Sequence, residues 1–207
     1  MPPAKPDRRT ERTRAALMSA FVAMVLADGY DAVTVERVAE RANVGRSTFY
    51  MHYTGKEDIL RQAMTRPSSV LAVLVGNELP PDVLVKQLEH FREQRARNHV
   101  FFTPPVRAIW VKALAGLIEP RLAPIVRHAH ARPILPLPAI ALQIAEAQIA
   151  LITHWLFSRP PIKVEAAAEA MVATTSATLA ALLRAPPNAR LVVPGEKLRV
   201  VRQGEEP

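Results

Sequence analysis

Polar, basic and aromatic side chains are concentrated between residues 46 and 56. Most of them fall in one short predicted helix over residues 46–52, in which Phe49 is the obvious inward-facing residue. Arginine can donate two hydrogen bonds to guanine, hydroxyl groups can reach base edges, and lysine and tyrosine can hold phosphates. This chemistry suits a DNA surface. The residues that we expect to contact it are Arg46, Ser47, Thr48, Tyr50, His52, Tyr53 and Lys56. The alternative is a solvated polar helix whose aromatic rings pack inward.

The segments around this helix indicate how it is positioned. A helix is expected over residues 10–27 and a second over residues 35–42, the latter after Thr34 as N-cap. The turn Asn43-Val44-Gly45 then leads into the third helix, and two short helices joined by such a turn are typical of a helix-turn-helix. A fourth helix is expected to open with a capping box at Thr54-Gly55-Lys56-Glu57, in which threonine and glutamate satisfy free backbone donors.

The order of residues 34–60 resembles the N-terminal domain of the TetR family of bacterial transcriptional regulators. The core of the likeness is Thr-Phe-Tyr-x-His-Tyr-x-x-Lys-Glu, residues 48–57. The likeness as a whole covers about residues 10–62. Its upstream part includes Arg14, Leu17, Ala20, Phe21, Gly29 and Tyr30. The resemblance implies an all-α fold of about nine helices and a dimer that binds operator DNA through the third helix. It also implies release of that DNA when a small molecule fills the C-terminal domain.

The resemblance also implies roles for single residues. Base readout falls to Arg46, Ser47 and Tyr50. Phosphate contacts fall to Thr34, Tyr50, His52 and Lys56. Gly45 stands where the family often has serine, which removes one hydroxyl group from the surface.

Paired prolines divide the rest of the chain, and no sustained strand-like alternation interrupts it. Because proline removes a backbone donor and clashes with the preceding turn, we interpret the pairs as helix boundaries. The expected helices are 69–77, 82–97, 105–117, 120–131, 139–158 and 163–184. The predicted organisation is therefore a basic flexible arm over 1–9, a DNA-binding domain over 10–66, a ligand-binding and dimerisation domain over 67–184 and a tail over 185–207.

The two long alanine-rich helices, 139–158 and 163–184, occupy the place where the family forms a four-helix dimer interface. By this resemblance the residues expected in or near the interface are Trp155, Met171, Thr175, Leu179 and Leu182. The alternative place for these side chains is the core of one protomer.

A cavity for a partly apolar small-molecule effector requires apolar walls with a few polar anchors. The candidates on the central helices are His90, Phe91, Phe101, Phe102, Arg107, Trp110, His128, Gln143 and His154. Each of them could instead be an ordinary core or surface residue. We expect no metal, because His128 and His130 are two residues apart and splay on a helix, with no carboxylate or cysteine nearby.

Composition narrows the remaining classes of function. The 207 residues include no cysteine, 27 Lys plus Arg and 19 Asp plus Glu, for a formal charge of +8. The chain lacks a G-x-S-x-G elbow, a phosphate-binding glycine loop and an H-E-x-x-H motif, so we expect neither an enzyme nor a bound cofactor. No run is apolar enough for a membrane span and no secretory signal is recognisable, which favours the cytoplasm and the nucleoid. The alternative functions are a ligand-independent regulator or a protein-interaction module on the same fold, with an enzyme a remote third.

Overall fold

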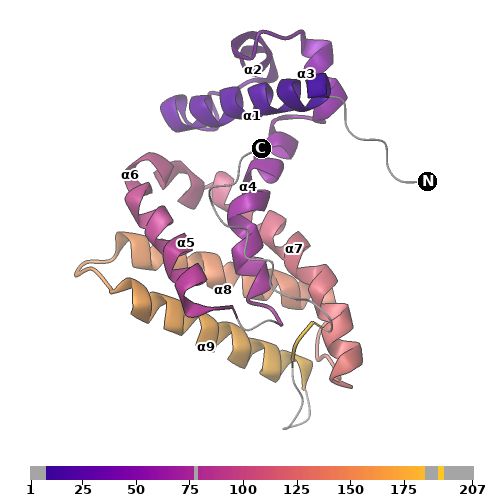
Figure 1. The fold of residues 1–207 in the computed structure, drawn as a ribbon, viewed down its shortest axis with the longest axis vertical. Helices are drawn as coiled ribbons and strands as arrows, with labels where there is room; N and C mark the ends of the chain where they lie inside the picture. Colours follow the sequence, from indigo (N-terminus) through magenta and orange to yellow (C-terminus); the bar gives the residue numbers. More distant parts are fainter. Residues whose placement is uncertain (1–7, 77–78, 185–190, 194–207) are drawn as a thin grey trace.

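Helices account for all the regular secondary structure in the part of the chain that the computed structural model describes, residues 8–76, 79–184 and 191–193. These residues form nine α-helices and one 3-10 helix, which confirms the predicted all-α class. The first three helices, joined by short loops, form a unit at one end of the molecule (Figure 1). Helix α4 connects this unit to a larger helical bundle.

The N-terminal unit consists of α1 (Arg8–Asp28), α2 (Val35–Arg41) and α3 (Arg46–His52). The bounds agree with the predicted ones to within two residues. Thr34 caps α2, since its side-chain oxygen accepts a hydrogen bond from the backbone N–H of Arg37 at 3.3 Å. At the turn before α3, Asn43 takes a left-handed conformation with φ 54°, which asparagine tolerates better than most residues. The turn chemistry therefore sets the angle at which α3 leaves α2.

The start of α4 (Lys56–Val73) differs from the predicted capping box. Gly55 is the N-cap and its helix end receives no side-chain hydrogen bond, so Thr54 does not cap. Instead the carboxylate of Asp58 accepts a hydrogen bond from the backbone N–H of Thr54 at 3.0 Å. A carboxylate in the first turn also interacts favourably with the helix dipole. Asp58 therefore stabilises the start of α4 both by this interaction and by its hydrogen bond with Thr54.

Three prolines lie in the interior of described helices. Pro67 is within α4, which joins two predicted helices and crosses the predicted domain boundary at residue 66. Pro120 and Pro124 lie within α7 (Val106–His128), which likewise joins two predicted helices. The predicted helix over 82–97 is instead divided into α5 (Pro81–Glu93) and α6 (Arg95–Asn98). A 3-10 helix, η1 (His99–Phe102), connects α6 to the loop before α7.

The bundle is completed by α8 (Leu137–Phe157) and α9 (Val164–Leu183), close to their predicted bounds. Helix α7 packs against α4 on one side and α8 on the other, and α9 lies against α8 and α5 (Figure 1). Buried polar side chains connect these layers. The amide nitrogen of Gln148 donates to the carbonyl oxygen of Leu71 at 3.3 Å and to Oγ1 of Thr175 at 3.2 Å. This network connects α4, α8 and α9.

Among the described residues, α8 and α9 are long and apolar enough to cross a membrane by length and composition. About half of α8 and two fifths of α9 is buried inside the protomer. Core helices of proteins that never enter a bilayer have the same properties, so the length and composition alone are weak evidence for a span. The sequence prediction of no membrane span had not foreseen this ambiguity.

Candidate nucleic-acid interface and cavity

The outer face of α3 carries most of the residues predicted to contact DNA. Arg46, Ser47 and Tyr50 are exposed, whereas Phe49 points inward and is fully buried. Met51, which sequence analysis did not single out, is the most exposed large apolar side chain described, at 74%. An exposed methionine between polar residues can contact thymine methyl groups. The position of Met51 next to Tyr50 is the feature of the sequence that could have indicated this role.

Arg46 is held in a defined position on this face. Its guanidinium nitrogen Nη1 lies 3.0 Å from Oε1 of Glu36 on α2, and its central carbon lies 5.6 Å from the centre of the Tyr50 ring. Hydrogen bonding to Tyr50 and the charge of Glu36 raise the pKa of the Arg46 guanidinium. A backbone hydrogen bond, together with the charge of Arg46, lowers the pKa of Glu36. The base-reading candidate is therefore paired with an acid before any DNA is present.

The remaining candidates near α3 surround a hollow between the start of α1 and α3. Thr48 and His52 are partly buried and line this hollow, of about 400 Å³, together with Met51 and Arg9 of α1. Thr34 lies at the start of α2, exposed, with its oxygen already capping that helix. Its side chain also hydrogen-bonds to the carboxylate of Glu36 and helps to lower the pKa of that group, so both functions of the hydroxyl are already in use.

One predicted contact needs correction. Tyr53 is only 1% exposed, its ring lies 5.6 Å from that of Phe49, and its hydroxyl donates to the carbonyl of Arg14 at 3.4 Å. Burial raises the pKa of the Tyr53 phenol. Its side chain therefore belongs to the core of the N-terminal unit and does not face DNA.

Lys56 is also engaged internally. Its ammonium donates to the carbonyls of Tyr30 and Val33, each at 3.3 Å, and lies 4.4 Å from the centre of the Tyr30 ring. Because an ammonium has three N–H donors, one remains for a phosphate. Lys56 thus joins α4 to the loop before α2 while it stays partly exposed.

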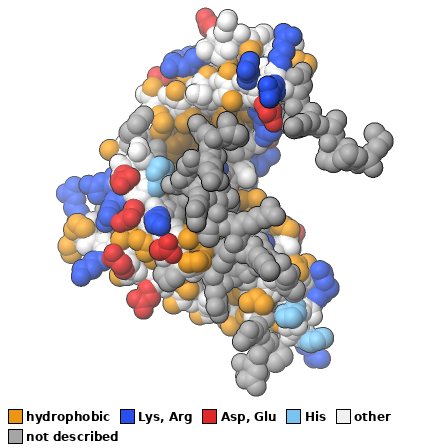
Figure 2. All heavy atoms as spheres, in the orientation of Figure 1, with side chains coloured by type: hydrophobic (Ala, Val, Ile, Leu, Met, Phe, Trp, Pro, Cys, Tyr) orange, Lys and Arg blue, Asp and Glu red, His pale blue; other side chains and the backbone are white. Residues whose placement is uncertain are grey.

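Basic side chains are not confined to the helix-turn-helix. Figure 2 shows Lys and Arg on the N-terminal unit and also on distant parts of the bundle on the same face. The placement of particular groups on α3, rather than the overall charge of +8, therefore distinguishes the N-terminal surface.

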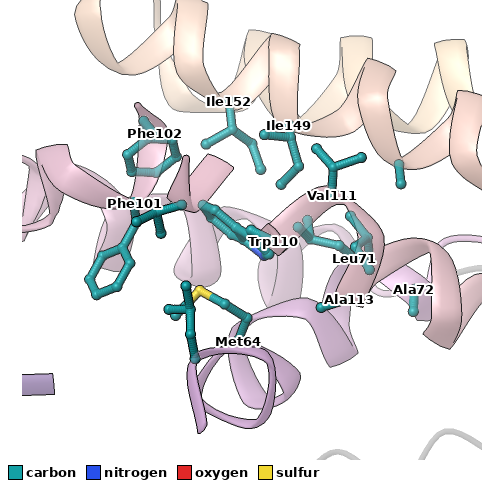
Figure 3. Close-up of a cluster of buried hydrophobic side chains, with 14 of the residues drawn as sticks. Met64, Leu71, Ala72, Phe101, Phe102, Trp110, Val111, Ala113, Ile149 and Ile152 are labelled. Carbon is teal, nitrogen blue, oxygen red and sulfur yellow. The ribbon is translucent and has the colours of Figure 1, made fainter. Parts of the chain in front are cut away.

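A second site is a cavity of about 380 Å³ bounded by α4, α5, η1 and α7. Five residues expected around a ligand do line it: His90, Phe91, Phe101, Phe102 and Trp110. The rings of Phe91, Phe102 and Trp110 meet edge to face, with centroids 5.1 Å apart for Phe102 and Trp110 and 5.9 Å apart for Phe91 and Trp110. Figure 3 shows Met64 of α4, Phe101 and Phe102 of η1 and Trp110 of α7 close together.

Four other predicted cavity residues do not line it. Arg107 is held by an ion pair in which its Nη2 lies 2.7 Å from Oε2 of Glu146. His128, at the end of α7, and both Gln143 and His154, on α8, are exposed. Gln143 and His154 were assigned to the cavity because α8 is apolar around much of its circumference, so its sequence does not mark the inward face.

Sequence analysis missed four residues of the cavity wall. Met64, Arg66 and Pro67 come from α4, and Gln87 comes from α5. Met64 and Arg66 were missed because the predicted domain boundary at residue 66 placed them in a different domain from the cavity.

The residues predicted for the dimer interface lie mainly inside one protomer. Met171, Thr175, Leu179 and Trp155 are each at most 4% exposed, and only Leu182 is partly accessible. The indole N–H of Trp155 donates to the carbonyl of Ile162 at 3.0 Å, which closes the α8–α9 connection. The stripe recognised in the sequence is therefore the inner face of α9 and not its outer one.

Among the described residues, no three or more His, Cys, Asp or Glu side chains gather in a way that could hold a metal ion. His128 lies at the end of α7 and His130 in the following turn, both exposed.

Comparison with known sequences relates the N-terminal unit to one family. Residues 17–63 match the family model described as bacterial regulatory proteins, tetR family. The HTH-type transcriptional regulator TcmR of Streptomyces glaucescens is 37% identical over 76 residues, which are 36% of this chain and 32% of that protein. The uncharacterized HTH-type regulator YxbF of Bacillus subtilis (strain 168) is 42% identical over 86 residues, 40% of this chain and 22% of that protein. The chain thus spans a third or less of the length of these relatives.

Solved structures resemble the whole described fold. A TetR-family regulator from Streptomyces coelicolor A3 superposes with a TM-score of 0.54 at 18% identity, over 85% of this chain and 99% of that one. A TetR transcriptional regulator from Streptococcus agalactiae 2603V gives a TM-score of 0.52 at 23% identity, over 82% and 96%. At these identities the likeness shows the fold alone, and it extends well beyond the N-terminal match.

Proposed function

Because the chain belongs to the TetR family of bacterial regulatory proteins, we propose that it is a transcriptional regulator that binds operator DNA through α3. One observation carries the proposal. The outer face of α3 presents Arg46, Ser47 and Tyr50 to solvent while Phe49 anchors the helix in the core. A helix of this width enters the major groove, where arginine pairs with guanine and hydroxyls reach neighbouring bases.

The active form that we propose is a homodimer formed through the outer faces of α8 and α9. Exposed alanines repeat along one side of α9 at residues 166, 170, 173, 177 and 181, a spacing that places them on one face. Small side chains allow two helices to approach closely, and the large apolar content of both helices favours covering this face. A two-fold axis would set the reading helices about 34–36 Å apart, which matches a palindromic operator.

The cavity between α4, α5, η1 and α7 is the proposed site of a small-molecule effector. Ligand pockets commonly have volumes of about 300–1,000 Å³ and mostly apolar walls with few polar groups. The cavity of about 380 Å³ with four aromatic residues in its wall fits that description. The proposed regulator is a repressor that acts in the cytoplasm by occupying a promoter and leaves it when the effector binds.

Selection from a random DNA library followed by mobility-shift titration tests the DNA-binding proposal. Wild-type protein should enrich a palindromic sequence, and its affinity should fall steeply with rising salt because bound phosphates release counterions. Arg46→Ala should lose discrimination at one base position per half-site, by about 1–3 kcal/mol. The matched control is Arg132→Ala, which removes an exposed arginine between α7 and α8, far from α3 in sequence. Failure of the wild type to enrich any sequence would overturn the proposal.

A further inference from the structure

Aromatic rings form much of the wall of the cavity. Phe91, Phe102 and Trp110 meet in three edge-to-face pairs with centroid separations of 5.1–6.4 Å. Phe101 and Met64 line the same cavity and lie close to Phe102 and Trp110 in Figure 3. Aromatic walls present both faces and edges to a ligand, and a planar ring can stack favourably against them.

The polar groups of the same wall carry only positive charge or none. Of the nine lining residues, Arg66 and His90 are the groups that can bear positive charge, and none is Asp or Glu. Arg66 forms no ion pair with any residue that the structure describes. By contrast, Arg107 nearby in the fold is matched by Glu146 at 2.7 Å. Among the residues that the structure describes, this guanidinium at the edge of the cavity therefore has no carboxylate partner.

We propose that the cavity binds an aromatic carboxylate, with its ring against Trp110 and Phe102 and its carboxylate on Arg66. The planar guanidinium offers two parallel N–H donors, a geometry that matches a carboxylate better than a neutral hydroxyl group. Gln87 adds a neutral donor and acceptor to the same wall. The identification of this ligand as the effector rests on the proposed function, whereas its binding to the cavity does not.

An aromatic cavity could equally suit a cation, since cations bind to the faces of aromatic rings. The charges of the wall decide against that class. A cationic ligand would meet Arg66 and His90 and would find no carboxylate among the lining residues. A neutral aromatic compound would gain the stacking but would leave the guanidinium without an anion.

Isothermal titration calorimetry on the full chain with three probes of one shape tests the proposal. The probes are 2-naphthoate, 2-naphthalenemethanol and 2-naphthylmethylammonium, which share a ring system and differ in charge. We expect naphthoate to bind about tenfold tighter than the alcohol or better, in line with hydrogen bonds to a charged group, and the ammonium to bind weakest. Equal affinity for acid and alcohol, tightest binding of the ammonium, or no binding of any probe would each overturn the proposal.

Matched arginine variants test the anchor itself. Arg66→Gln should reduce the affinity for naphthoate about tenfold and bring it near that of the alcohol, whose affinity should stay unchanged. Arg95→Gln is the control, because Arg95 is also exposed, makes no ion pair with a described residue and does not line the cavity. An equal loss in both variants would show a general charge effect and contradict the assignment of Arg66. Circular dichroism melting of each variant verifies that it is folded.

The effect of the probe on DNA is a separate measurement. If naphthoate binds through Arg66 and also weakens binding of the selected operator, the ligand class and the effector role are both supported. If naphthoate binds through Arg66 but the protein enriches no DNA sequence, the proposed regulatory function fails while the ligand class stands.

Discussion

Ser68 and Trp110 form a hydrogen bond in the core that joins α4 to α7. The indole N–H donates to the Ser68 hydroxyl oxygen at 2.9 Å, and Ser68 is fully buried. Ser68→Ala would leave this N–H buried without an acceptor, so we expect the free energy of unfolding to fall by about 1–3 kcal/mol in urea denaturation. Ser69→Ala is the neighbouring control, since Ser69 is exposed, and should change that free energy by less than about 0.5 kcal/mol. An equal loss of unfolding free energy in the Ser68→Ala and Ser69→Ala variants would contradict the stabilising role of the hydrogen bond between Ser68 and Trp110.

Glu36 is the residue that we expect to tune how Arg46 reads DNA. Its Oε1 lies 3.0 Å from Nη1 of Arg46, so the arginine is already oriented across the α3 surface before it meets DNA. Glu36→Gln should broaden the base preference at the position that Arg46 reads, because the side chain is then free to reach more than one base.

Glu40→Gln is the control for the charge change alone. Glu40 lies exposed on the same helix and makes no ion pair with a described residue. Both variants should bind all DNA about twofold tighter through the lost repulsion from phosphates about 10 Å away. Sequencing of selected libraries measures base preference, and identical preferences for the two variants would contradict the role of Glu36.

At the scale of elements, the end of α4 depends on one glycine. Gly76 has φ +84°, and a Cβ atom there would lie 2.4 Å from Cδ1 of Ile125 in α7. Gly76→Ala should therefore lower the free energy of unfolding by more than the 1–2 kcal/mol or so that a left-handed backbone alone costs. Gly116 lies inside α7 with no atom within 4 Å of its would-be Cβ, so Gly116→Ala should raise that free energy by about 0.5–1 kcal/mol. The melting temperature should fall for Gly76→Ala and rise for Gly116→Ala. A change in the same direction in both variants would contradict this explanation.

The N-terminal helices could be predicted almost to the residue because their signals are local. The cap at Thr34 and the left-handed turn at Asn43 depend on residues next to them in the sequence, and Phe49 is the one large apolar residue of α3 that is buried. The long helices were harder because proline at positions 67, 120 and 124 is outweighed by tertiary packing. A proline inside a helix costs about 3 kcal/mol, whereas α7 buries eight residues, Trp110 and Ile118 among them. Sequence alone does not reveal that compensation.

The faces of α8 and α9 could not be assigned from sequence for a different reason. Both helices are apolar around most of their circumference, so a hydrophobic stripe does not distinguish the inside of the protomer from an outer face. The stripe through Met171 and Leu179 proved to be internal. Gln143 and His154, expected in the cavity, proved to be external. The aromatic cavity residues were found because rings of that size are seldom left exposed.

At the scale of the whole molecule, the proposed dimer makes a prediction that separates assembly from folding. Ala177→Glu places a charge on the exposed alanine face of α9 and should give monomers in sedimentation velocity while the melting temperature of the protomer is retained. Ala96→Glu, at an exposed alanine of α6, is the control and should remain dimeric. Leu179→Glu should instead unfold the protomer, because Leu179 is only 3% exposed. A dimeric Ala177→Glu variant would contradict the assigned interface.

The two tryptophans of the chain lie at different places in the bundle, and this gives the protein two optical reporters. Trp110 lines the cavity, while Trp155 is buried at the α8–α9 connection with its N–H on the Ile162 carbonyl. The tryptophan emission of a Trp155→Phe variant would come from the cavity wall, and that of a Trp110→Phe variant from the C-terminal end of α8. Fluorescence from the first should respond to a molecule that enters the cavity. Fluorescence from the second should respond only when α8 and α9 themselves rearrange, so the arrival of a ligand and the response of the bundle can be timed separately in one protein.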